Sequence, residues 1–173
     1  MPVSQIAAEL GISYQFAYNV AAKAGLLRSA PKAPSIVKPM KPPLTVPLLL
    51  AGGFEQTGEW LLSPAGALTI STPPPRMPGV YAFVQDKEAR YVGVTLRTLF
   101  ERMNLYRHGH SSQPTNVVMR ARLIEELSAA KPVSIYTVQP PDGEWNGWPI
   151  TTSAGLEIAL IRRYRLPWNK KGI

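Results

Sequence analysis

Six polar side chains between residues 81 and 169 have types and spacings suited to acid–base and anion chemistry. An arginine guanidinium is a planar, permanently charged fork that matches phosphate oxygens, and a glutamate carboxylate is a hard oxygen ligand for cations such as Mg²⁺. A tyrosine hydroxyl accepts a proton only where nearby cations lower its pKa from about 10. The six residues are Tyr81, Tyr91, Arg102, Tyr106, Glu157 and Asn169.

The two earlier tyrosines lie in PGVYAFVQDKEARYVGVT, residues 78–95, whose pattern predicts a β-hairpin. Apolar residues alternate on both sides of a polar turn at residues 85–88, as expected of paired strands. Taken alone, this hairpin is more typical of tyrosines that only fill a half-buried sheet surface. Arg102 and Tyr106 follow four residues apart, so they share one face of a predicted helix.

The order of these residues resembles the GIY-YIG nuclease superfamily over residues 78–172. The hairpin comes first, an arginine and a tyrosine one turn apart follow, and the stretch GLEIALIRRYRLPWN supplies a helical Glu157 and a late Asn169. The resemblance implies a small α/β fold and a Mg²⁺- or Mn²⁺-dependent hydrolysis of phosphodiester bonds. It further implies cleavage with a single metal ion that leaves a 5′-phosphate and a 3′-hydroxyl.

The resemblance also implies a role for each residue. Glu157 would hold the metal, Arg102 would bind phosphate, and Tyr81 would accept a proton from the attacking water. Tyr91 and Tyr106 would orient water and phosphate, and Asn169 would order the site. Tyr106 stands where many members of the superfamily have histidine.

One residue more separates Tyr91 from Arg102 than in the repair-type members, so Arg97 stays an alternative catalytic arginine. His108 and His110 lie two residues apart in a predicted loop. Histidines so placed seldom form a metal site, and we leave both outside the core site.

Residues 3–26, VSQIAAELGISYQFAYNVAAKAGL, predict two short helices that resemble a helix-turn-helix. Ser4 and Ser13 are the expected caps, and the spacing Ala7, Gly11, Val20 is that of a helix contact, a turn and an apolar anchor. Phe16, Ala17 and Val20 are expected to point inward. The outward residues, able to read DNA bases, would be Tyr14, Gln15, Tyr18 and Asn19. A two-helix cap or an oligomerisation element is the alternative.

The remaining pattern divides the chain into residues 1–27, a Pro/Lys-rich linker at 28–47 and a catalytic domain at 48–173. The catalytic domain is predicted to begin with an edge hairpin, residues 60–62 and 67–70. A helix capped by Thr95 should run to Tyr106 with Leu96 on its buried stripe, and a second should follow with Val118 inward. A strand at 133–138, a loop at 139–150 with two tryptophans and a helix at 154–164 complete an α/β fold: a small sheet flanked by helices.

The composition favours a polyanionic partner. The 173 residues carry a formal net charge of +8, and basic surface is typical of nucleic-acid binding; Arg97, Arg107 and Arg120 are the candidate DNA contacts beside the site. Cysteine is absent, and the apolar run LTVPLLLAGGF is too short to span a membrane, so we expect a cytoplasmic protein.

The sequence therefore predicts a metal-dependent DNA endonuclease, sequence-specific and of restriction or mobile-element type. Two alternatives stay open, a structure-specific repair nuclease and a non-catalytic helix-turn-helix regulator. The oligomeric state, a homodimer included, is left open too.

Overall fold

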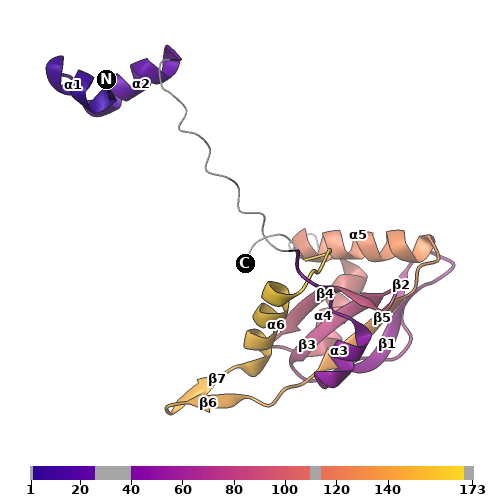
Figure 1. Ribbon diagram of the computed structural model, residues 1–173. Helices are drawn as coiled ribbons and strands as arrows, with labels where there is room; N and C mark the ends of the chain where they lie inside the picture. Colours follow the sequence, from indigo (N-terminus) through magenta and orange to yellow (C-terminus); the bar gives the residue numbers. More distant parts are fainter. Residues whose placement is uncertain (1, 26–39, 110–113, 170–173) are drawn as a thin grey trace. The chain divides into compact units, whose positions relative to one another are not determined.

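The computed structural model of the chain describes residues 2–25, 40–109 and 114–169 (Figure 1). The chain divides into two compact units, Met1–Pro39 and Met40–Ile173. The second unit has the predicted α/β class, with a five-stranded antiparallel sheet flanked by helices. Within the described ranges, no helix is long and apolar enough to cross a membrane.

The first unit contains two helices, α1 (Val3–Glu9) and α2 (Tyr14–Lys23). Ser13 caps α2 as predicted, because its hydroxyl oxygen accepts the Phe16 N–H at 3.3 Å. The cap predicted at Ser4 is wrong. Pro2 precedes the first helical residue instead, and no side chain caps α1.

The contact between α1 and α2 is made by small residues. Ala7 and Ala17 are the buried residues of the two helices, and Gly11 forms the turn with a φ of 64° that favours glycine. Phe16 and Val20 are 60% and 51% exposed, so the prediction that they point inward is wrong. The described part of this unit has only these two helices, and neither covers that face.

The sheet of the second unit has the strand order β2-β1-β5-β3-β4, and every neighbouring pair is antiparallel. The predicted hairpin is formed by β3 (Gly79–Gln85) and β4 (Glu88–Thr95), with Asp86 and Lys87 at positive φ in a two-residue turn. The predicted edge hairpin is also present, as β1 (Glu55–Leu62) and β2 (Leu68–Ile70). The fifth strand is β5, Val133–Val138.

Helices cover both faces of this sheet and give it two cores. On one face, α4 (Leu99–His108) and α5 (Pro114–Ser128) pack against Tyr81 and Phe83 of β3. On the other, α3 (Val46–Ala51) and α6 (Thr152–Arg163) pack against the alternate residues of the same strand. The period-2 alternation of β3 thus places Tyr81 on the face covered by α4.

Helix α4 begins later than predicted. Thr98 caps it, with Glu101 completing a reciprocal capping box, whereas Thr95 is the last residue of β4. Leu96 therefore lies in the connecting loop and is 67% exposed. In α5, Leu123 is buried as predicted, but Val118 is exposed and Met119 is buried in its place, so the prediction for Val118 is wrong.

Two predicted irregular segments have structure. Residues 40–47, assigned to the linker, belong to the second unit, because Leu44 is buried in the core beneath α6 and α3 begins at Val46. The predicted loop at 139–150 contains a second hairpin, β6 (Gly143–Trp145) paired with β7 (Trp148–Ile150). Figure 1 shows that this hairpin projects beyond the N-terminal end of α6.

Candidate active site

Three tyrosine hydroxyls and one guanidinium meet on the face of the sheet covered by α4. The hydroxyl oxygens of Tyr81 and Tyr106 are 2.7 Å apart, and Tyr106 donates to Tyr91 at 3.4 Å. Arg102 donates from Nε to Tyr81 at 3.0 Å and from a terminal nitrogen to Tyr106 at 2.7 Å. The structure thus brings four of the six predicted residues into one hydrogen-bonded cluster.

A β-bulge in the hairpin makes this meeting possible. The register shifts between Phe83 and Val84, so that Tyr81 faces Gly93 and Phe83 faces Tyr91. Directly opposite residues share a face of the sheet. Without the extra residue, Tyr91 would point to the opposite face, away from the cluster.

Gly93 gives the Tyr81 ring its space. A Cβ atom at Gly93 would lie 2.5 Å from the Tyr81 hydroxyl oxygen and 2.6 Å from Cζ. The hydroxyl end of the ring therefore lies directly over this glycine, where the hydroxyl oxygen accepts from Arg102 Nε. Gly79 is equally constrained, since a Cβ there would lie 2.6 Å from the Val138 carbonyl oxygen of β5.

Arg102 links the cluster to an open groove. Its third partner is Asn116, whose side-chain oxygen accepts from the guanidinium at 3.1 Å. The guanidinium is half-buried and also lies 4.5 Å from the centre of the Tyr106 ring. Arg102 and Arg97 both line a groove of about 660 Å³. Within the described part of the chain, Arg102 is the one of these two arginines that hydrogen-bonds to the tyrosines.

Asn116 was missed by the sequence prediction. It is fully buried in the first turn of α5, whereas the sequence RHGHSSQPTN predicts a loop there. A polar residue just before an apolar helical run was the available signal, and it equally suits a helix cap.

Burial keeps the Tyr81 and Tyr106 hydroxyls neutral. It raises the pKa of Tyr81 above the ordinary value of about 10, the neighbouring Tyr91 adds to the rise, and Arg102 offsets only part of it. Burial likewise raises the pKa of Tyr106. The condition for a proton-accepting Tyr81, a lowered pKa, is not met by Arg102 alone.

Glu157 and Asn169 lie along the outer edge of β4, the last strand of the sheet. The Asn169 side chain accepts the Val92 N–H at 3.0 Å and donates to the Val92 carbonyl at 2.8 Å. Two residues further along, the Val94 N–H donates to the Glu157 carboxylate. These two side chains satisfy main-chain groups that an edge strand otherwise leaves open.

Glu157 is half-buried, and burial raises the pKa of its carboxyl above the ordinary value of 4.5. The Val94 N–H and the charge of Arg102 act in the opposite direction and only partly compensate. A desolvated carboxylate with incomplete charge compensation suits a cation. The described ranges contain no cluster of three His, Asp or Glu side chains, but Mg²⁺ needs only one or two protein carboxylates because it keeps several waters.

The other predicted contacts are spread over both units. Arg97 is exposed beside the groove, while Arg107 and Arg120 donate to the carbonyls of Leu68 and Arg107 respectively. His108 is exposed at the end of α4, and His110 lies outside the described residues. In the first unit, the four predicted base-reading residues are all exposed, namely Tyr14, Gln15, Tyr18 and Asn19.

The fold has a counterpart among solved structures. A mutant of bacteriophage T4 EndoII matches 72% of this chain and 97% of its own length, with a TM-score of 0.60 and 21% sequence identity. The restriction endonuclease HPY188I, solved in complex with product DNA, matches 79% of this chain and 90% of its own length, with a TM-score of 0.45 and 16% identity. The likeness to EndoII shows a shared fold. No family model matches the chain, and no curated protein matches its sequence.

Proposed function

We propose that the protein is a metal-dependent DNA endonuclease of the GIY-YIG type. The observation that carries the proposal is the contact of Arg102 with the Tyr81 and Tyr106 hydroxyls at the wall of an open groove. This arrangement joins a permanent positive charge to a chain of proton-bearing oxygens. Phosphodiester hydrolysis requires both, a cation for the developing negative charge and a route for the proton of water.

Arg102 would bind the scissile phosphate and stabilise its charge in the transition state. Its contacts with Tyr81, Tyr106 and Asn116 hold the guanidinium plane in place before substrate arrives, which avoids reorganisation during the reaction. Arg97 is more exposed and does not share these contacts among the described residues, so we assign it to binding of the DNA backbone rather than to catalysis.

The tyrosine hydroxyls would orient the attacking water and carry its proton. Tyr81 is neutral in this structure because burial raises its pKa, so it serves as a hydrogen-bond partner until a further positive charge lowers that pKa. Tyr106 and Tyr91 extend the chain of hydroxyls away from Tyr81.

Glu157 is the residue that would hold Mg²⁺ or Mn²⁺. Its carboxylate oxygens are hard ligands, and the Val94 N–H fixes the group at the edge of β4. When bound, the cation would supply charge stabilisation for the phosphate oxygens. Asn169 would keep β4 in register beside it through its two bonds to Val92.

A plasmid-nicking assay with and without Mg²⁺ tests the proposal. We expect cleavage only with the metal, and loss of cleavage in Glu157→Gln, which keeps an oxygen for the Val94 N–H. Arg102→Lys keeps the charge but loses the fork, and removal of one such transition-state donor costs about 100- to 1000-fold in rate. Arg97→Lys is the matched control and should retain most of the activity.

The outcomes separate the candidate functions. Cleavage without metal, or by Glu157→Gln at the parental rate, contradicts the proposed site. Tight DNA binding by a parent protein that never cuts would instead favour a non-catalytic regulator. Cutting of branched substrates only would favour a structure-specific repair nuclease.

The predicted arm, residues 1–27 of the first unit, is proposed to select the DNA site, in keeping with a restriction or mobile-element role. Its exposed Gln15 and Asn19 side chains are hydrogen-bonded to each other at 3.3 Å, and amides of this kind read adenine edges in the major groove. Deletion of the arm should leave metal-dependent nicking but relax the choice of site. Unchanged sites and rates after deletion would make the arm structural.

A further inference from the structure

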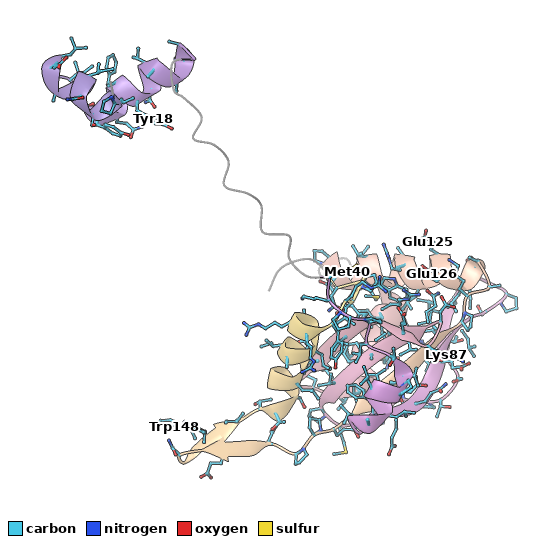
Figure 2. All side chains as sticks on the ribbon, in the orientation of Figure 1. Tyr18, Met40, Lys87, Glu125, Glu126 and Trp148 are labelled. Atoms are coloured by element: carbon cyan, nitrogen blue, oxygen red, sulfur yellow. The ribbon has the colours of Figure 1, made fainter. Side chains whose placement is uncertain are left out.

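The β6–β7 hairpin exposes two tryptophans at its tip. Trp145 and Trp148 face each other across the turn and are 67% and 74% exposed. Asn146 and Gly147 form the turn with φ of 49° and 83°, the conformation of a tight two-residue hairpin turn. All six strand residues are exposed. Directly opposite residues lie on one face of a strand pair, so both indoles lie on one surface (Figure 2, where Trp148 is labelled).

The hairpin is fixed to the helix that carries Glu157. The Asp142 carboxylate accepts the N–H of Thr152, the first residue of α6, at 3.1 Å. The Glu144 carboxylate accepts the Gly147 N–H of the turn, also at 3.1 Å. The two acidic groups therefore bond to main-chain groups at the base and the tip of the hairpin. The contact at the base, on Thr152, lies little more than one helical turn before Glu157.

The base of the hairpin adjoins the active-site groove. A depression of about 430 Å³ is lined by Asp142, by residues at the start of α6 and by Leu96. Leu96 also lines the groove that contains Arg102, and it is exposed. The surface around Arg102 thus continues past Leu96 to the foot of the hairpin.

We propose that this hairpin is an aromatic wedge whose indole rings stack on DNA bases beside the cleaved phosphate. The inference rests on the proposed nuclease function and adds a contact to bases. Residues 132–161 contain no lysine or arginine, whereas the whole chain has a net charge of +8. The hairpin therefore offers no cationic side chain to phosphates, but aromatic faces stack on bases.

The dimensions favour DNA over a second protein. Three residues per strand extend about 10 Å, which matches about three base steps at roughly 3.4 Å each. A stable protein interface takes about 20–30 residues from each partner, and the hairpin presents six strand residues. Two indoles are enough for stacking on one or two bases.

The test is DNA affinity as a function of salt, measured by fluorescence anisotropy with the full chain in the Glu157→Gln background. Replacing Trp145 and Trp148 together with alanine should weaken binding about 10- to 100-fold. The slope of log affinity against log salt should stay at the parental value, because no phosphate contact is lost. The corresponding pair of phenylalanines should restore most of the affinity.

A leucine pair at the same positions keeps apolar bulk across the hairpin but lacks an aromatic face, and it should bind as weakly as the alanine pair. Leu61→Ala, an exposed apolar change on β1, is the matched control and should bind as the parent. Parental affinity of the alanine pair overturns the wedge, as does full rescue by leucine or a change in salt slope. A change in oligomeric state of the alanine pair, measured by sedimentation, would assign the hairpin to a protein partner instead.

Metal-dependent cleavage by the parent protein distinguishes failure of the hairpin proposal from failure of the proposed nuclease function. If the parent cuts DNA while the tryptophan variants bind and cut equally well, only the wedge fails. If the parent neither binds nor cuts DNA, the proposed nuclease function fails and the wedge fails with it.

Discussion

Replacing Gly93 with alanine tests the geometry of the candidate site most directly. The added Cβ would lie 2.5 Å and 2.6 Å from two atoms of the Tyr81 side chain and 2.9 Å from Cε1 of Tyr91. Contacts below 3.0 Å are essentially never seen for real Cβ atoms. Tyr81 has no exposed surface, so its ring cannot swing into solvent and must displace other core side chains.

The cost follows from overpacking and from the bonds that Tyr81 makes. Extra volume in a packed core costs about 1–3 kcal/mol, and displacement of the hydroxyl also weakens a hydrogen bond to a charged group, about 1.5–3 kcal/mol. We expect Gly93→Ala to lower the free energy of unfolding by about 2–5 kcal/mol. For a chain of this size that is a fall in Tm of roughly 5–15 °C.

Urea unfolding, thermal melting and plasmid nicking measure the effect. Gly155→Ala is the control, because a Cβ at that position in α6 meets nothing within 4 Å and alanine favours the helix; it should be neutral or slightly stabilising. In the double variant with Tyr81→Phe, the Cβ–hydroxyl contact is gone, so the two changes should cost less together than the sum of the single changes. A stable, fully active Gly93→Ala protein would refute the placement of Tyr81 over Gly93.

Three further changes probe the remaining residues. Glu157→Gln should abolish cleavage but raise the Tm of the metal-free protein at neutral pH. Burial raises the pKa of this carboxyl, so its ionisation opposes folding. The difference in Tm between parent and variant should therefore vanish as pH falls below the ordinary pKa of the carboxyl. Tyr81→Phe should cost about 1–3 kcal/mol by leaving the Nε–H of Arg102 without its acceptor, and it should cut the nicking rate about 10²- to 10⁴-fold. Asn169→Ala should speed hydrogen exchange of the Val92 amide, because the Asn169 side chain accepts that N–H in the parent. Asn169→Asp keeps an acceptor oxygen and should exchange at an intermediate rate. Equal exchange rates in the parent and both variants would contradict the edge contact.

The elements that carry the candidate site were predictable because their signals are local. The period-2 alternation around Tyr81 identifies β3 and its two faces, and the four-residue spacing of Arg102 and Tyr106 places them on one side of α4. The exposed positions of α2 followed from the same kind of pattern. Its inward face did not, since Phe16 and Val20 remain exposed where the described residues of that unit offer no third element.

The details that join these elements depend on tertiary structure. A regular hairpin closed by the Asp86–Lys87 turn would pair Tyr81 with Val92, and only the bulge brings Gly93 opposite it. Nothing in the spacing of the sequence indicates a bulge at that point. Asn116 was equally out of reach, because its contact with Arg102 joins helices α4 and α5, whose packing sequence periodicity does not specify.

The edge of β4 shows why the late part of the chain matters to the site. Edge strands expose unpaired main-chain groups that invite pairing with another strand. Here the main-chain N–H of Trp168 donates to the Arg90 carbonyl at 2.8 Å. The Asn169 side chain bonds both main-chain polar groups of Val92, and the Glu157 carboxylate accepts from the Val94 N–H. The groups that close this edge thus include the proposed metal ligand. Protection of the sheet and placement of Glu157 are therefore coupled, and a change that frees the edge of β4 should also loosen the carboxylate beside Arg102.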